Sequence, residues 1–119
     1  VHGLDSLDEI SLSSPTQVSE LKNGTVKTYT IQPEDFGLKR TPLSEIKGGD
    51  PSENAVIIRE VLNGKRGPQR DIVLLNTAFA MAAAGLVSDP KEGIELAGKT
   101  IDSGNALRKL KELVRFTNN

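Results

Sequence analysis

Two adjacent acidic residues, Asp8 and Glu9, are the first candidates for chemistry in this sequence. They lie between Val1-His2-Gly3, which is typical of a strand end entering a loop, and the serine-rich segment 11–14. Mg²⁺ prefers oxygen ligands and commonly takes one or two carboxylates together with substrate phosphate oxygens. Neighbouring carboxylates can converge on a metal from a loop, whereas on a regular strand they point to opposite faces. The spacing alone therefore leaves two interpretations open, a metal site and a solvated turn.

Three further positions have a chemical interpretation and a simpler structural one. His2 is the only histidine, so any histidine-based metal site or serine–histidine–acid triad needs it, although a hydrogen-bonded histidine at a strand end is simpler. Lys47-Gly48-Gly49-Asp50 looks like a phosphate-binding glycine loop but lacks the established spacings, so a turn leading to an Asp50 helix cap explains it with fewer assumptions. Arg70-Asp71 begins a predicted helix, where Asp71 suits the positive helix end and Arg70 is expected to pair locally.

The element that must hold the first part of the chain together is a β-hairpin over about residues 16–32. Strands are predicted over 16–21 and 25–32, on either side of Asn23-Gly24, the strongest short hairpin signal. With this turn, the predicted cross-strand partners include Val18 with Tyr29, Thr16 with Ile31, Leu21 with Val26 and Glu20 with Lys27. Apolar residues then face apolar ones and opposite charges meet, as an antiparallel pair requires.

About five helices follow the hairpin, and several of their starts are marked by an acid or threonine before a proline. They are predicted over Pro42–Ile46, Pro51–Leu62, Pro68–Ala84, Pro90–Asp102 and Ala106–Phe116. Asp50 with Glu53 and Asp89 with Glu92 have the spacing of a capping box. The hairpin with helices indicates an α/β or α+β class.

Three helical faces are predicted to be buried. On 51–62 the apolar stripe comprises Ala55, Ile58, Val61 and Leu62, and on 106–116 it comprises Leu107, Leu110, Leu113 and Val114. Residues 71–84 are apolar on every face, which is typical of a helix buried on all sides. One hairpin and about five short helices are too few to enclose such a helix, and the chain begins at Val1 in what looks like a strand. We therefore expect a piece of a longer protein.

Composition excludes several classes of protein. The 119 residues contain no cysteine, so disulfide scaffolds and thiolate metal sites are excluded. A net charge of −1 and only one tyrosine and three phenylalanines argue against nucleic-acid binding. The most apolar stretch, 72–87, is shorter than the ~20 residues that span a bilayer. No signal peptide is visible, and we therefore expect a cytoplasmic protein without membrane contact.

Seven ordered segments together resemble the C-terminal part of the anthranilate phosphoribosyltransferase family. They are Val1-His2-Gly3, Leu7-Asp8-Glu9-Ile10-Ser11, Pro15-Thr16, Ile31-Gln32-Pro33-Glu34-Asp35-Phe36-Gly37, Gly48-Gly49-Asp50 with Glu53-Asn54-Ala55, Arg70-Asp71-x-Val73-Leu74-Leu75-Asn76, and Ile101-Asp102-Ser103-Gly104-x-Ala106. The resemblance covers essentially the whole chain.

The resemblance implies an α/β class, with residues 1–119 forming the C-terminal part of a mostly parallel-sheet domain. It implies transfer of the phosphoribosyl group of phosphoribosyl pyrophosphate (PRPP) to anthranilate in tryptophan biosynthesis, with release of pyrophosphate. The family's adjacent Asp-Glu pair binds Mg²⁺ and matches Asp8 and Glu9. The glycine-rich PRPP loop, the anthranilate contacts and most of the helical domain that forms the usual homodimer interface would precede Val1, so this piece alone is expected to be inactive, and no catalytic residue is assigned within it.

One departure from the family pattern and two alternatives accompany this interpretation. Ser6 occupies a place that is usually glycine, and it would strain the loop if that position needs a positive φ. The first alternative is a relative of the pyrimidine nucleoside phosphorylases, and the second is a non-catalytic paralogue that binds nucleic acid. The segment Leu7–Ser11 favours the transferase over the first, and the retained acids with the net charge of −1 disfavour the second.

Overall fold

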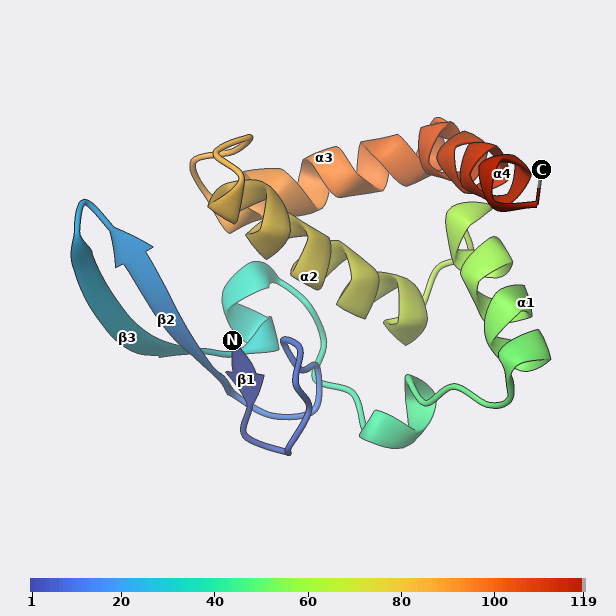
Figure 1. The fold of residues 1–119 in the computed structure, drawn as a ribbon. Helices are drawn as coiled ribbons and strands as arrows, with labels where there is room; N and C mark the ends of the chain where they lie inside the picture. Colours follow the sequence, from blue (N-terminus) through green and yellow to red (C-terminus); the bar gives the residue numbers. More distant parts are fainter. Residues whose placement is uncertain (119) are drawn as a thin grey trace. The chain divides into compact units, whose positions relative to one another are not determined.

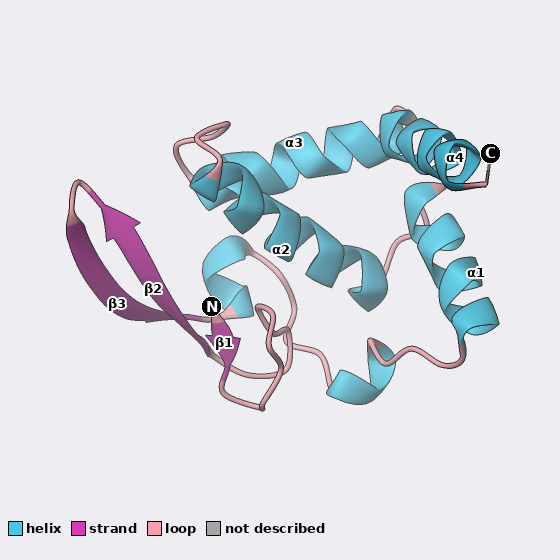
Figure 2. Cartoon of the chain, in the orientation of Figure 1, coloured by secondary structure: helices cyan, strands magenta, loops and turns pink. Residues whose placement is uncertain are grey.

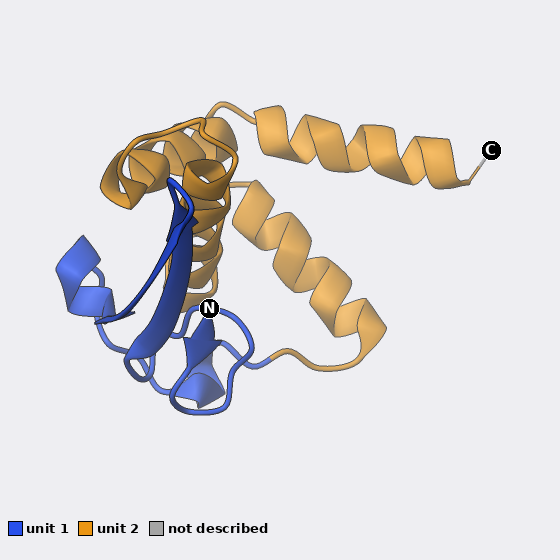
Figure 3. Cartoon of the chain, turned by 60° about the vertical axis from the view of Figure 1, so that its left-hand side comes forward, with its two compact units in different colours: residues 1–47 blue, residues 48–119 orange. Residues whose placement is uncertain are grey.

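The computed structural model describes residues 1–118 and divides into two compact units, residues 1–47 and the residues from Gly48 onward (Figure 3). The first unit contains all the strands, and the second contains the four α-helices of the described chain (Figure 1).

The first unit is built on a three-stranded antiparallel sheet in the order β1-β2-β3 (Figure 2). The strands are β1 (His2–Gly3), β2 (Thr16–Lys22) and β3 (Thr25–Ile31). The predicted hairpin register is confirmed, since Val18 pairs with Tyr29 and Glu20 with Lys27. Asn23 and Gly24 both have positive φ, 52° and 75°, which is what a two-residue turn that matches strand twist requires.

The base of the hairpin is buried, and its tip is exposed. Thr16, Val18 and Ile31 are buried, whereas Leu21 and Val26 at the turn are 71% and 65% exposed. After Ile31 the chain forms short 3₁₀ helices at Pro33–Phe36 and Leu43–Glu45. The predicted helix over 42–46 is therefore only a single 3₁₀ turn.

The second unit consists of four α-helices. They are α1 (Pro51–Leu62), α2 (Pro68–Ala83), α3 (Pro90–Asp102) and α4 (Asn105–Thr117). The predicted helices agree with these bounds to within one residue at each end. Proline at the first position of α1, α2 and α3 explains this accuracy, because its fixed φ suits the first turn and its missing N–H needs no partner there.

The two acidic helix caps behave differently. At α1 the Asp50 carboxylate accepts the Glu53 N–H and the Glu53 carboxylate accepts the Asp50 N–H, both at 2.9 Å, so the predicted capping box is confirmed. At α3 the Asp89 carboxylate accepts the N–H of Lys91 at 2.9 Å instead. The box predicted there was wrong, because Asp89 caps the second helical residue and not the third.

Small residues bring α2 and α3 together. A Cβ placed on Gly93 of α3 would lie 2.8 Å from the Cα and 2.9 Å from the Cβ of Ala78 on α2, so the backbones approach too closely for any side chain. The buried core of this unit consists of Val61, Leu74, Ala97 and Ile101, with partly buried Ile57 and Met81 against it. Glycine at this crossing is therefore a packing requirement.

The predicted apolar faces are only partly covered in this chain. On α1 the core is reached by Ile57 and by Val61 and Leu62 of the predicted stripe, whereas Ile58 of that stripe is 49% exposed. On α4, Leu113 and Val114 are 56% and 50% exposed, so their predicted inward placement is wrong here. The prediction that α2 is buried on all sides also fails within this chain, since Val73 is exposed.

Two glycine substitutions on α3 test the close crossing. Gly93→Ala is expected to destabilise the fold by roughly 1–3 kcal/mol, because the new methyl group overpacks the contact with Ala78. Gly98→Ala is the matched control: its Cβ would meet only Arg70 Nη2 at 3.7 Å, so it should stabilise the helix by about 0.5–1 kcal/mol. Urea unfolding followed by circular dichroism measures both, and equal stabilities of the two variants would contradict the proposed packing role.

Candidate functional site

The candidate metal-binding residues lie on residues 4–15, which we call the acidic loop. Its ends are joined by a hydrogen bond from the Leu4 N–H to the Pro15 carbonyl at 2.9 Å. Just before the loop, the Gly3 N–H donates to the Leu7 carbonyl at 2.8 Å and the Ser6 N–H donates to the Gly3 carbonyl at 3.0 Å. The chain thus leaves β1 through a tight turn and then enters β2 beside it.

Asp8 and Glu9 lie on a bend of the acidic loop and not on a strand, which is the condition under which adjacent carboxylates can serve one ion. Both residues are exposed, and among residues 1–118 no lysine, arginine or histidine nitrogen lies within 4.0 Å of either carboxylate. Their oxygens are therefore not used in ion pairs.

The donor set around these two acids fits a partial magnesium site. Within the described part of the chain, no group of three or more histidine, cysteine or acidic side chains is placed to hold a metal ion. Two carboxylates cannot form a complete protein cage, but Mg²⁺ normally keeps several waters and adds substrate phosphate oxygens to one or two carboxylates. Asp8 and Glu9 suit that mode of binding.

Asp5 is the acidic residue that the fold does use within this loop. Its carboxylate accepts hydrogen bonds from the Ser11 hydroxyl at 2.6 Å, from the Ser13 hydroxyl, and from the Leu7 N–H at 3.3 Å. Burial raises the pKa of the Asp5 carboxyl, but the bonds from Ser11 and Ser13 outweigh it and leave the pKa below its ordinary value. Asp5 is therefore ionised and fixed.

The serines that bind Asp5 are themselves anchored. The Ser11 N–H donates to Thr16 Oγ1 at 3.0 Å, and the Ser13 N–H donates to Ser11 Oγ at 2.9 Å. Ser11 and Thr16 are each 1% exposed, so the bond between them is shielded from water. Asp5 is not among the sequence candidates, because its only signal in the sequence is an acid followed by several serines, which does not identify its partners.

The other sequence candidates serve structural roles. His2 is exposed on β1, where its backbone pairs with Gln17. At Gly49 the N–H donates to Asn54 Oδ1 at 2.9 Å, and its carbonyl accepts from Asn54 Nδ2 at 3.0 Å. Glu53 and Asn54 fill the space beside Gly48 and Gly49, where a Cβ would collide with their side-chain oxygens. This segment is thus the glycine turn and helix cap of the simpler interpretation.

Arg70 forms a long-range ion pair and not a local one. It is 1% exposed, and its Nη1 lies 2.7 Å from Asp102 Oδ1 at the end of α3. Arg66 Nη2 approaches the other oxygen of Asp102 at 3.3 Å. The hydrogen bond from Arg70 holds the pKa of Asp102 below its usual value, whereas burial raises the pKa of Asp71. Arg70 therefore joins the start of α2 to the end of α3.

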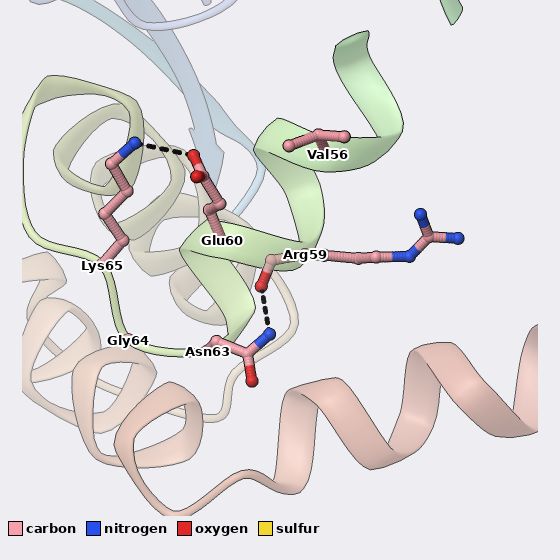
Figure 4. Close-up of a pocket in the computed structure, with 6 residues that line it drawn as sticks. All are labelled: Val56, Arg59, Glu60, Asn63, Gly64 and Lys65. Carbon is pink, nitrogen blue, oxygen red and sulfur yellow. Dashed lines mark hydrogen bonds and ion pairs between the residues drawn. The ribbon is translucent and has the colours of Figure 1, made fainter. Parts of the chain in front are cut away.

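A shallow hollow of about 550 Å³ lies beside the C-terminal end of α1 (Figure 4). It is lined by Val56, Arg59, Glu60, Asn63, Gly64 and Lys65. Lys65 pairs with Glu60 at 2.6 Å, and Asn63 Nδ2 donates to the Arg59 carbonyl at 2.8 Å. These internal pairs are those of a helix end, and the hollow has no arrangement of a nucleophile with a base.

Comparison with known proteins identifies the family. Residues 1–107 match the model of the glycosyl transferase family, α/β domain. The chain belongs to this family. Its membership agrees with the α/β class expected from the sequence.

Curated relatives of this glycosyl transferase segment share a name. The anthranilate phosphoribosyltransferase of Geobacter sulfurreducens is 49% identical over 118 residues, which are 99% of this chain and 34% of the relative. That of Rhodopseudomonas palustris is 54% identical over 114 residues, 96% of this chain and 34% of the relative. The chain thus spans about a third of the length of the curated relatives it matches.

Solved structures give the same result. Anthranilate phosphoribosyltransferase from Thermus thermophilus superposes with a TM-score of 0.86 at 38% identity, covering 97% of this chain and 34% of that one. The Saccharomyces cerevisiae enzyme in complex with PRPP and Mg superposes with a TM-score of 0.82 at 37% identity, over 92% of this chain and 32% of that one.

None of the helices within residues 1–118 combines the length and the hydrophobicity that are needed to span a bilayer.

Ser6 is the position at which this glycosyl transferase segment bears local strain. Its φ is 75°, in the left-handed backbone region that residues other than glycine and asparagine rarely adopt. Ser6→Gly is expected to stabilise the protein by about 0.5–1 kcal/mol, because relief of the strain exceeds the added freedom of the unfolded chain. Ser44→Gly, at an exposed 3₁₀ position without positive φ, should instead lower stability. Thermal unfolding checks both, and a destabilised Ser6→Gly variant would refute the argument.

The Arg70–Asp102 pair predicts a pH-dependent stability. Because the folded-state pKa of Asp102 is lowered, its contribution is present above the ordinary carboxyl pKa and is lost as the pH falls through the lowered value. Asp102→Asn should be less stable than the parent near neutral pH, since it leaves the buried Arg70 charge without its partner, and the difference should narrow in acid. Glu112→Gln, which breaks only exposed pairs with Lys109 and Arg108 on the same helix, is the control and should change stability far less. Urea unfolding from about pH 7 to about pH 3 measures this, and a difference that does not change with pH would exclude it.

Proposed function

We propose that residues 1–119 are the C-terminal part of the α/β domain of an anthranilate phosphoribosyltransferase. The longer enzyme would transfer the phosphoribosyl group of PRPP to the amino nitrogen of anthranilate and release pyrophosphate, a step of tryptophan biosynthesis. The observation that carries this proposal is the pair Asp8 and Glu9, exposed and free of cationic partners on an anchored loop, in a chain about half identical to relatives of that name.

In this proposal Asp8 and Glu9 hold Mg²⁺. The ion would neutralise charge that develops on the leaving pyrophosphate. The two carboxylates would supply part of its ligand shell and orient it, while the diphosphate and water complete that shell. The acidic loop keeps both side chains away from lysine and arginine, so their oxygens stay available.

The rest of the activity belongs to the part of the longer chain outside these 119 residues. Since the relatives are about three times as long, we propose that the remainder supplies the PRPP loop, the anthranilate contacts and the homodimer interface. The partners of the whole enzyme would then be PRPP, anthranilate and a second copy of itself.

Activity of the isolated and completed chain tests this proposal. The purified 119-residue chain should show no anthranilate-dependent turnover. A chimera in which residues 1–119 replace the corresponding third of the Geobacter sulfurreducens relative should be active, because 49% identity over 99% of the chain preserves the fold. Measurable turnover by the isolated chain, or turnover of thymidine with phosphate in preference to PRPP with anthranilate by the full-length protein, would refute the assignment.

Substitution of the two acids in the chimera tests the metal site. Asp8→Asn and Glu9→Gln are each expected to lower kcat/KM for PRPP by about 100-fold at limiting Mg²⁺, because each removes a ligand of the ion that stabilises the leaving group. Glu45→Gln, an exposed acid of the same unit without an ion pair, is the control and should leave the rate unchanged. Normal Mg²⁺ dependence in both site variants would refute the role of these residues.

A further inference from the structure

We infer that Asp5 is a positioning residue for the pair Asp8 and Glu9: by holding both limbs of the acidic loop, it fixes the direction in which the two carboxylates point. This inference rests on the proposed function, since it concerns the same metal site. It adds a residue that touches neither metal nor substrate and acts through the loop backbone.

The hydrogen bonds of Asp5 enclose the pair on both sides. On the incoming limb its Oδ1 accepts from the N–H of Leu7, the residue before Asp8. On the outgoing limb its Oδ2 accepts from the hydroxyls of Ser11 and Ser13, two and four residues after Glu9. One carboxylate therefore fastens both approaches to the bend, and the bend itself lies between the two fastened points.

The outgoing limb is fixed to the body of the first unit. The Ser11 N–H donates to buried Thr16 Oγ1 at 3.0 Å, and the Thr41 N–H donates to the Leu12 carbonyl at 2.9 Å. Ile10 and Leu12 are 1% and 0% exposed. The incoming limb has no such apolar anchor at Leu4 and Ser6, which are exposed, so its position against the outgoing limb depends on the Leu4–Pro15 backbone bond at its base and on Asp5.

Close packing around Asp5 makes this role specific to its length and shape. A Cβ on Gly3 would lie 2.6 Å from Asp5 Oδ1, so the strand end leaves just enough room for the carboxylate. A third acid within five residues of Asp8 and Glu9 also adds like-charge repulsion, which a purely structural position could avoid with a neutral side chain. Charge-assisted bonds to three donors offset that repulsion.

The test uses the full-length chimera with the Geobacter sulfurreducens relative. Asp5→Asn should raise the Mg²⁺ concentration for half-maximal rate by roughly 10-fold, as expected for loss of a residue that orients metal ligands, with kcat largely restored at saturating Mg²⁺. Calorimetric titration of Mg²⁺ in the presence of PRPP should show the same loss of affinity. Hydrogen exchange at the Leu7 amide, measured without metal, should become faster.

Two further variants separate positioning from charge and from folding. Ser13→Ala removes one bond to Asp5 without changing the charge and should raise the Mg²⁺ requirement several-fold; it decides the question if Asp5→Asn does not fold. Asp35→Asn neutralises an acid of the same unit that accepts only the Gln32 N–H, and it should leave the Mg²⁺ requirement unchanged.

The outcomes distinguish this inference from the proposed function. If Asp8→Asn alters the Mg²⁺ requirement and neither Asp5→Asn nor Ser13→Ala does, the positioning role is wrong and the metal site stands. The positioning role would also be overturned if Asp5→Asn lowered the reaction rate by the same factor at every Mg²⁺ concentration and left the affinity for Mg²⁺ in the titration unchanged. If Asp8→Asn itself has no effect on Mg²⁺, the proposed function fails, and the role of Asp5 fails with it.

Discussion

If two adjacent like charges bind a metal, as we propose for Asp8 and Glu9, they must be held in place without using their own oxygens, and the first unit meets this constraint. Asp8 and Glu9 form no salt bridges with the described residues, which suits the proposed site because a lysine or arginine would occupy the positions of the proposed ion. The fold instead fixes the backbone on either side of them, through Asp5, two serines and Thr16. The carboxylates then project from a rigid base into solvent.

The second unit uses its acids in the opposite way. Asp50 and Glu53 satisfy N–H groups at the start of α1, and Asp102 neutralises the buried Arg70 where α2 and α3 meet. Each of these carboxylates improves the stability of the helices, and none is free to bind a ligand. The contrast with Asp8 and Glu9 is physical: the acids of the second unit have donors within hydrogen-bond distance, whereas the proposed metal-binding pair forms no ion pair with the described residues.

Local patterns predicted the parts of this structure that depend on local physics. The hairpin register follows from Asn23-Gly24, because the turn alone sets which residues face each other. Helix bounds follow from proline at the first position, since that residue determines where a helix can begin. The predicted site pair was placed on a loop, as the structure has it, although its magnesium role stays a prediction.

Features that depend on distant residues could not be predicted in this way. Arg70 finds Asp102, 32 residues away, and nothing near Arg70 in the sequence indicates that partner. Asp5 was missed because its importance lies in bonds to two serines, and a carboxylate near serines is ordinary in any loop.

Ser6 shows how firmly the acidic loop is determined. A serine at φ 75° is strained, and such strain persists only where the surroundings leave no other conformation. Here the turn is closed by backbone hydrogen bonds from the Gly3 N–H to the Leu7 carbonyl and from the Ser6 N–H to the Gly3 carbonyl. The Leu7 N–H is in turn bound to the Asp5 carboxylate. The backbone therefore accepts an unfavourable residue without changing its path. Because the loop keeps this conformation in spite of the strain at Ser6, it supports the proposal that the fold sets the orientation of Asp8 and Glu9.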